Sequence, residues 1–385
     1  MKKISQWPKY DKQMLDGINK IIKRGEVNYL FGNWGKKFEK SFSKYHDIPY
    51  SIAVSNGTMG LEIAIAALEL SKNDEVIVTP RSYYSSASCI IKNNLKPVFV
   101  DIDIKTQNIL VNDLLKKITK KTKCIICVHL GGIPCEMNKI IKIANKFNIK
   151  VIEDCSQAHG AMIDNKIVGS FGDIGVWSFC NDKIISTLGE GGMISTKYKK
   201  LYKKIWSLKD IGKNMDKYYA NNQKKIGFQW LHDTIGTNAR LTEIQSYAGY
   251  YQLKKLKYYL RIRNRNANFI INNLKKLGCF IFLNYPSNFS NAYYRLNFMY
   301  DPSFNSKSLS RNNILKDLGR KINIREGSCP AIYNEKYFKS NFKSFCPNAE
   351  YVGKNSLSLQ VDHTISKNDL NVVVKTIKNY IKKYQ

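Results

Sequence analysis

Short apolar runs alternate with amphipathic segments between about residue 51 and residue 196. The apolar runs predict strands at 51–54, 75–78, 97–100, 124–128, 150–153, 174–179 and 192–195. Leu61, Ile65 and Leu68 share one face at the helical period, and residues 136–147 repeat this pattern. Continuous apolar strands between helices predict an α/β fold with a mostly parallel central sheet flanked by helices. In such sheets ligands bind beyond the carboxyl ends of the strands.

The pattern changes after about residue 240. Residues 240–278 read as one long helical stretch that ends at Gly278, with an apolar stripe and a basic, solvated face. Residues 279–385 mix short strands with a terminal helix, which predicts a smaller α+β domain. We therefore expect a large domain with an N-terminal arm over 1–250 and a small C-terminal domain over 251–385.

Composition narrows the class of protein. The formal net charge is +32. Such a charge is compatible with binding of nucleic acid, with an anionic small-molecule substrate, or with a general enrichment of the chain in lysine. The lysines are spread along the chain and no nucleic-acid-binding motif is present. We therefore favour general enrichment in lysine, with a small contribution of the positive charge to binding an acidic substrate, and we expect no nucleic-acid partner. No run approaches the ~20 apolar residues of a membrane span, and the first residues lack the apolar part of a signal peptide. We expect a soluble, cytoplasmic protein.

The nine cysteines are scattered, as expected for reduced thiols in the cytoplasm. Cys124 and Cys127 resemble a metal or redox pair, but residues three apart in a strand point to opposite faces. They therefore predict two buried thiols. The histidines show no metal-ligand spacing, so we expect no metal.

Two segments at strand ends carry candidate chemistry. In "AVSNGTMG", Gly57 permits close backbone approach and Thr58 offers a hydroxyl where a helix begins near Met59, which suits a phosphate group. Thr58 also suits a simple helix N-cap. In "VIEDCSQAHGA", Asp154 ends a buried strand and Gln157 follows. The carboxylate either caps the next segment or faces a protonated ring nitrogen.

Two further segments complete the set. In "SFCNDKIISTLGEGG", Ser178 precedes Lys183, which is either a solvated loop residue or a reactive amine. In "TPRSYYSS", Tyr83 and Tyr84 follow a strand and are either core filler or a platform for a flat ring.

Together these are the parts of a pyridoxal phosphate (PLP) site. That cofactor needs an amine for a Schiff base, an acid beside its ring nitrogen, a phosphate cup and a stacking surface. The lysine must be neutral to attack the aldehyde, so we expect burial and neighbouring positive charge to lower its pKa.

The first 255 residues or so resemble the DegT/DnrJ/StrS-type nucleotide-sugar aminotransferase family, which has the aspartate aminotransferase fold (fold type I). The specific stretches are "EDCSQAHGA" and "SFCNDKIISTLGEGG", supported in order by "NYLFGNWGKKFEKSFSKY", "SNGTMGLEIAIAAL" and "GTNARLTEIQSYAGYYQL". The resemblance implies Lys183 as the Schiff-base and proton-transfer lysine, Asp154 as the partner of the ring nitrogen and Gln157 beside the ring hydroxyl.

The resemblance also assigns the rest of the cofactor site. Tyr84 aligns with the stacking aromatic, with Tyr83 close by. The residues that match the phosphate cup are Gly57, Thr58, Met59 and Ser178. Asn238 matches a residue that reaches the phosphate from the other subunit, which implies a homodimer with shared active sites.

The chain departs from the family pattern at Ile211 and Asp362, where histidines are common, and by the extra residue Leu188 before Gly189. These departures put substrate identity in doubt. Arg81 is either an anion-binding residue or an ordinary surface arginine.

Several residues near these motifs are expected to have supporting roles. His129, His159 and Cys155 are expected to be structural, and so is Cys180. Glu190 is expected to help fold the lysine loop.

The resemblance implies transfer of an amino group from L-glutamate to a nucleotide-linked keto sugar for lipopolysaccharide, capsule or glycan synthesis. The alternative keeps the cofactor and acts on a small phosphorylated ketone or amino acid, as a transaminase or decarboxylase. A dehydratase of the same fold is disfavoured by Lys183, and a catalytically silent protein by the complete cofactor set.

Overall fold

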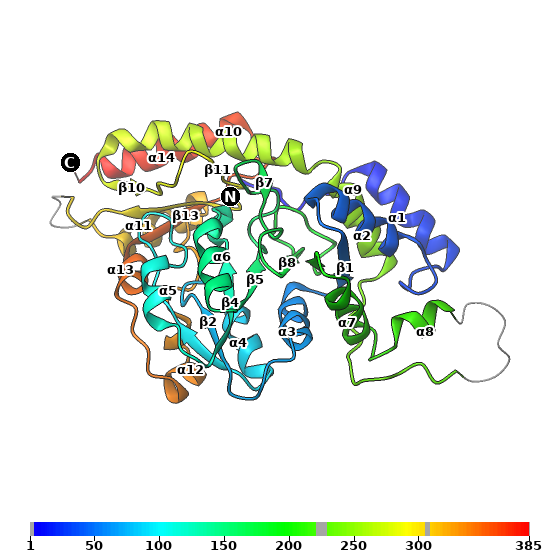
Figure 1. The fold of residues 1–385 in the computed structure, drawn as a ribbon. Coiled ribbons are helices and arrows are strands. Elements are labelled where there is room, and N and C mark those ends of the chain that lie inside the picture. The colour runs from blue at the N-terminus through cyan, green and yellow to red at the C-terminus, as the bar shows by residue number, and fades with distance from the viewer. Residues whose placement is uncertain (1–3, 221–228, 305–308, 385) are drawn as a thin grey trace.

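A seven-stranded sheet forms the centre of the larger part of the molecule (Figure 1). The computed structural model describes residues 4–220, 229–304 and 309–384. The strand order is β1-β9-β8-β5-β4-β2-β3, and β9 is antiparallel to both of its neighbours while the other pairs are parallel. The strands are β1 (Tyr50–Val54), β2 (Glu75–Val78), β3 (Lys96–Phe99), β4 (Thr122–Val128), β5 (Lys150–Asp154), β8 (Ile174–Ser178) and β9 (Gly192–Thr196).

Helices cover both faces of this sheet because alternate strand residues are apolar on both sides. One face packs on α3 (Gly57–Ala67), α4 (Ser85–Lys92) and α7 (Lys199–Lys209). The other packs on α5 (Val111–Lys117) and α6 (Met137–Lys146), and on α2 (Trp34–His46) toward its β1 end. Cys124 lies in the first of these cores and Cys127 in the second, which confirms that the two thiols point to opposite faces.

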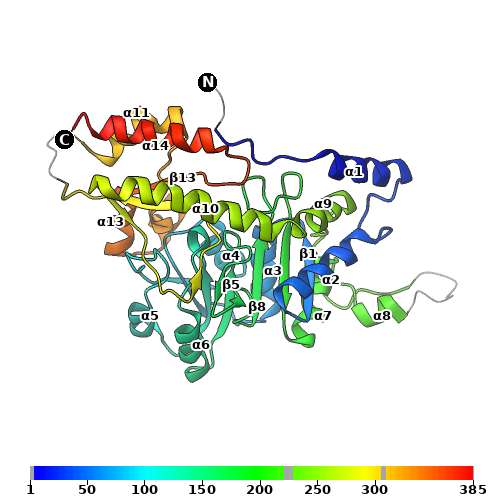
Figure 2. The same cartoon turned by 90° about the horizontal axis from the view of Figure 1, so that it is seen from above.

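The N-terminal segment runs over the end of the sheet that carries β1. Here α1 (Lys12–Arg24) and α2 lie beside α9 (Glu243–Leu253) in both views (Figures 1 and 2). The short helix α8 (Met215–Ala220) lies beyond α7.

A smaller antiparallel sheet, β10-β12-β13, packs against three helices. Its strands are β10 (Phe280–Phe282), β12 (Leu296–Tyr300) and β13 (Ser356–Leu359). The helices are α10 (Leu256–Leu274), α11 (Arg311–Ile322) and α14 (Lys367–Ile381), and they share one apolar core with the sheet. This arrangement is visible from above in Figure 2.

The remaining elements connect the two parts. A third sheet, β11-β6-β7, joins β11 (Phe289–Ser290) to β6 (Met162–Ile163) and β7 (Lys166–Ile167). Helices α12 (Lys336–Asn341) and α13 (Pro347–Asn355) pack through Phe338 and Val352 into the core of the large sheet. Single 3₁₀ turns lie at Leu130–Gly132, Lys275–Leu277 and Ile332–Asn334.

The strand predictions and the α/β fold with a smaller α+β part are confirmed, with strand ends within two residues. The single helix over 240–278 is wrong, because the chain forms α9 and α10 with a break at Lys254 and Lys255. Both helices contribute to one apolar core at this break, through Leu253 of α9 and Leu256 of α10. Farther from the break, α9 packs beside α1 and α10 packs on the smaller sheet. The domain boundary at residues 250 and 251 stays a prediction. In the described residues, no helix has the length and apolar character to cross a membrane.

Candidate active site at the carboxyl ends of the central strands

A cavity of about 720 Å³ lies beyond the carboxyl ends of β5 and β8. Seven of the predicted site residues line it: Gly57, Thr58, Met59, Asp154, Gln157, Ser178 and Lys183. They are far apart in sequence and meet because the strands that carry them end at the same edge. The volume is in the range of pockets that hold cofactors together with substrates.

The start of α3 forms one end of the cavity. Asn56 caps this helix, since its side-chain oxygen accepts the Met59 backbone N–H at 2.8 Å. The helix therefore begins at Gly57, two residues earlier than predicted, and Thr58 is not its cap. A Cβ on Gly57 would lie 2.7 Å from the Cβ of Ser178, so only glycine fits at this close approach. A helix N-terminus beside two hydroxyl side chains is suited to a phosphate group.

Asp154 is a buried carboxylate at the end of β5. It accepts hydrogen bonds from the Ser86 hydroxyl at 2.9 Å and from the Ser156 backbone N–H at 3.1 Å. In the ranges that the structure covers, it makes no ion pair. A buried anion without a cationic partner is costly, and a protonated ring nitrogen in the cavity would remove that cost.

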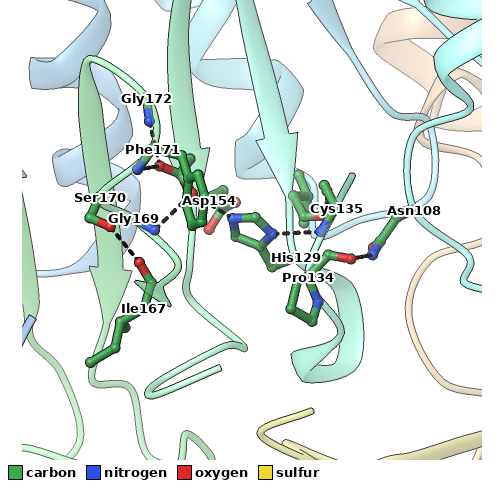
Figure 3. Close-up of polar contacts among 12 residues, drawn as sticks. Asn108, His129, Pro134, Cys135, Asp154, Ile167, Gly169, Ser170, Phe171 and Gly172 are labelled. Atoms are coloured by element: carbon green, nitrogen blue, oxygen red, sulfur yellow. Dashed lines mark hydrogen bonds and ion pairs between the residues drawn. The ribbon is translucent and has the colours of Figure 1, made fainter. Parts of the chain in front are cut away.

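The residue before Asp154 points to the other side of β5 and fixes the strand there. The Glu153 carboxylate accepts backbone N–H groups of Gly169, Phe171 and Gly172 at 2.7–2.8 Å. It also lies 3.1 Å from His129 Nε2, while His129 Nδ1 accepts the Cys135 N–H at 2.9 Å (Figure 3).

Glu153, His129 and Cys155 come close enough together to resemble a metal site. These hydrogen bonds occupy both carboxylate oxygens of Glu153 and both ring nitrogens of His129, so the cluster is a structural support for the strand end.

Gln157 and Lys183 complete the floor of the cavity. Gln157 is anchored by the Gly131 N–H, which donates to its Oε1 at 2.7 Å. The Lys183 amine lies 4.8 Å from the centre of the Tyr294 ring and 3.8 Å from Asp182 Oδ1.

The expected lowering of the Lys183 pKa is wrong for the protein without ligands. Burial lowers this pKa, but the neighbouring groups, Tyr294 and Asp182 first among them, together raise it above the ordinary value for lysine. Sequence reasoning foresaw the burial and missed the acid next to the lysine.

The two tyrosines after β2 take different positions. Tyr83 lines the cavity, whereas Tyr84 precedes α4 and its ring makes an edge contact with Phe338 of α12. The predicted stacking residue Tyr84 is therefore not brought to the cavity wall in this chain, and its role stays a prediction.

Asn238 lies outside this chain's cavity. It is exposed and its backbone bridges to Asp210. Its contact with the cofactor phosphate bound in a second subunit stays a prediction.

The departures from the family pattern lie away from the cavity. Ile211 is exposed, and Leu188 packs on the core beneath α1. Asp362 is buried and accepts hydrogen bonds from Ser5 and Thr364. None of the three lines the cavity, so the doubt that these departures raise about the substrate stays a prediction.

Arg81 is not a surface arginine. Its side chain is fully buried and donates to Gln107 Oε1 and to the Ser328 carbonyl, both at 3.1 Å. Burial lowers its pKa to about 10. It ties the loop after β2 to the loop after β3 and to the segment that follows α11.

Sequence reasoning also missed part of the cavity wall. The cavity is also lined by residues at the start of β12 and just after α11: Tyr294, Arg295, Asn297, Arg325 and Glu326. These residues come from the second half of the chain, where no motif marks them.

The comparisons with known proteins agree with this geometry. The model of the DegT/DnrJ/EryC1/StrS aminotransferase family matches residues 8–378. A GDP-perosamine synthase of Escherichia coli O157:H7 is 39% identical over 246 residues, 64% of this chain and 64% of that protein. A UDP-N-acetyl-3-dehydro-alpha-D-glucosamine 3-aminotransferase of Acidithiobacillus ferrooxidans is 30% identical over 353 residues, 90% of this chain and 88% of that protein. An aminotransferase of Psychrobacter cryohalolentis has a similar crystal structure, with a TM-score of 0.95, 36% identity, and coverage of 99% of this chain and 100% of that one.

The chain therefore belongs to the DegT/DnrJ/EryC1/StrS aminotransferase family, whose enzymes are PLP-dependent and have fold type I. The cavity fits this cofactor in three independent respects. It offers a glycine-lined helix start, a buried acid without a cation and an amine that faces the same space.

Proposed function

We propose that this aminotransferase moves an amino group from L-glutamate to a keto sugar carried on a nucleotide diphosphate, in the cytoplasm, for surface polysaccharide or glycan synthesis. The observation that carries the proposal is that the amine of Lys183 and the buried carboxylate of Asp154, which has no ion-pair partner among the described residues, line the same large cavity. Relatives that act on nucleotide-linked sugars give the proposal its substrate class.

Each residue of the cavity receives a role in this proposal. The start of α3, with Gly57, Thr58 and Met59, holds the cofactor's phosphate together with Ser178. Asp154 holds a proton on the ring nitrogen, and Gln157 contacts the ring hydroxyl. When bound, PLP supplies an electron sink that stabilises negative charge on the substrate carbon. The amine of Lys183 would hold the cofactor at rest and would carry a proton to and from that carbon during the reaction.

The same residues would serve both halves of the reaction. Bound PLP would supply the chemistry that carries an amino group from the amino acid to the keto sugar, held by the start of α3, Ser178, Asp154 and Gln157. Lys183 would take a proton from the amino-acid carbon and return one at the sugar carbon. Asn238 of a second copy would complete the phosphate site, so we propose a homodimer.

One experiment tests the reaction and the substrate class together. The purified protein is loaded with PLP and given glutamate labelled with ¹⁵N at the amino group. Each assay contains either a nucleotide-linked keto sugar or a small phosphorylated ketone. Mass spectrometry should find the label in the sugar nucleotide only, and label only in the small ketone would favour the alternative.

Two controls separate chemistry from binding. Lys183→Ala should abolish transfer of the label while the protein stays folded. Protein that never becomes yellow with PLP would contradict the assigned cofactor residues.

The stacking role is tested by comparing Tyr83→Ala with Tyr84→Ala for the dissociation constant of the cofactor.

A further inference from the structure

Asp182, the residue directly before Lys183, shares its cavity. The distance from Lys183 Nζ to Asp182 Oδ1 is 3.8 Å, and the lysine side chain is 13% exposed. Among the described residues, this is the one carboxylate within ion-pair distance of that amine. Adjacent side chains seldom converge in a strand, and here the turn after β8 brings them together.

The segment that leads into β12 holds the Asp182 carboxylate in place. The Tyr294 hydroxyl donates to Asp182 Oδ2, and Arg295 Nη2 lies 3.5 Å from the same oxygen. The Tyr294 ring also faces the Lys183 amine. The Asp182 side chain is 44% exposed, yet these contacts tie its carboxylate to a segment remote in sequence, just before β12.

Other charged or titratable groups face the lysine from the surrounding elements. Asp154 approaches from β5, while Cys180 and Glu190 lie on the same loop as the lysine. Arg295 contributes positive charge on the far side of Asp182. None of these groups is paired with the lysine amine, so Asp182 is the nearest source of negative charge.

We propose that Asp182 is a positioning residue that holds the Lys183 nitrogen in its protonated form, in the free amine and in the bond to the cofactor. This inference rests on the proposed role of Lys183. A carboxylate 3.8 Å away favours positive charge on the nitrogen. In the loaded protein this keeps the nitrogen positive near neutral pH, which makes the attached carbon more reactive toward the incoming amino acid.

The same charge has the opposite effect on the free amine. Only the neutral amine condenses with an aldehyde, forming the C=N bond and releasing one water. Removing the charge of Asp182 therefore speeds condensation at the lysine and makes the loaded nitrogen lose its proton at lower pH. A merely structural role for Asp182 predicts neither change.

The first test needs no cofactor. The apoprotein is reductively methylated with formaldehyde and cyanoborohydride at about pH 8, and labelling of Lys183 is followed by peptide mass spectrometry. Asp182→Asn should be labelled severalfold faster than the parent, because the neutral fraction of the lysine rises as its pKa falls. The matched control is Asp164→Asn, because Asp164 contacts Asn288 on a surface turn.

The second test uses the visible absorption of the PLP-loaded protein. Its pH midpoint should fall by about one unit in Asp182→Asn and by less in Tyr294→Phe, which keeps the carboxylate but loosens it. Equal labelling rates and equal midpoints in parent and Asp182→Asn would overturn the inference. A protein that shows the labelling difference but never binds PLP would instead contradict the proposed function.

Discussion

The indole Nε1 of Trp7 donates a 2.7 Å hydrogen bond to the backbone carbonyl oxygen of Lys183. The two residues are 176 positions apart in the chain. Trp7 is nearly buried, with its ring edge-on to Tyr259 and His363. The N-terminal arm therefore fixes the backbone of the lysine loop and leaves the amine free to act in the cavity.

Trp7→Phe should weaken cofactor binding. Phenylalanine keeps an aromatic ring but leaves the carbonyl without its donor, at a cost of about 1 kcal/mol. Because the lysine loop holds PLP, we expect this cost to weaken PLP binding and to raise the dissociation constant of PLP about fivefold. Fluorescence titration of the apoprotein with PLP measures it.

The matched variant is Trp34→Phe, because Trp34 also lies near the N-terminus but packs on Tyr247 and Tyr250. It should bind PLP like the parent. A Trp7→Phe protein that melts earlier yet keeps its affinity for PLP would show that the contact serves folding alone.

Gly57→Ala should abolish the phosphate site. The new Cβ would meet the Ser178 Cβ at 2.7 Å, and these are parts of two regular elements that cannot easily separate. We expect PLP affinity to fall by at least about tenfold, or 1.4 kcal/mol.

Gly319→Ala is the control for this change. Gly319 lies inside α11, and an added Cβ would come no closer than 3.5 Å to another atom. It should stabilise the protein by about 0.5–1 kcal/mol, because alanine is the better helix former. Equal PLP affinity of Gly57→Ala and the parent would refute the proposed phosphate site.

The strands were predictable because seven short runs of the chain are mostly apolar and largely buried. Asp154 and Lys183 could be placed at the cavity because Asp154 ends such a run and Lys183 lies in the loop that follows another. The position of Asp182, by contrast, depends on its contact with Tyr294, which lies more than a hundred positions later in the chain, and no local pattern predicts that contact.

The turn after β2 shows where local sequence ceases to be informative. Tyr83 and Tyr84 are the same residue type, but the backbone turn directs the Tyr83 ring to the cavity and the Tyr84 ring to Phe338. Arg81 was equally ambiguous, because the loop that buries it comes from residues 327–329. In each case the partner is remote and no periodicity connects the two.

Asp154→Asn should slow transamination by about 100-fold or more, the usual effect of removing a preorganised electrostatic contact. Asparagine keeps the shape and the hydrogen bonds to Ser86 and Ser156 but cannot hold the ring nitrogen charged. Stopped-flow measurement of the half-reaction with glutamate gives the rate. Ser86→Ala, which loses one 2.9 Å hydrogen bond to Asp154, should cost only about fivefold. If both variants lose activity equally, the charge of Asp154 is not what matters.

The free energy of unfolding should fall in acid because of buried neutral histidines. His46 is 1% exposed and stacked on Phe42, and burial lowers its pKa to about 3. His159 is likewise buried with a pKa of about 3. The unfolded chain binds a proton on each histidine near pH 6.5, well before the folded protein does. Their contribution is therefore complete above about pH 6.5 and is lost as the pH falls toward 3.

His46→Phe isolates one of these contributions. The ring stays stacked on Phe42, but the titrating group is gone, so stability should fall less steeply with acid by about 1.4 kcal/mol per pH unit. Urea denaturation of parent and variant between about pH 6 and 4.5 measures the two slopes. Carboxylates titrate equally in both proteins, so the difference in slope belongs to His46. Parallel stability curves over this range would mean that His46 is protonated in the folded protein, against its burial.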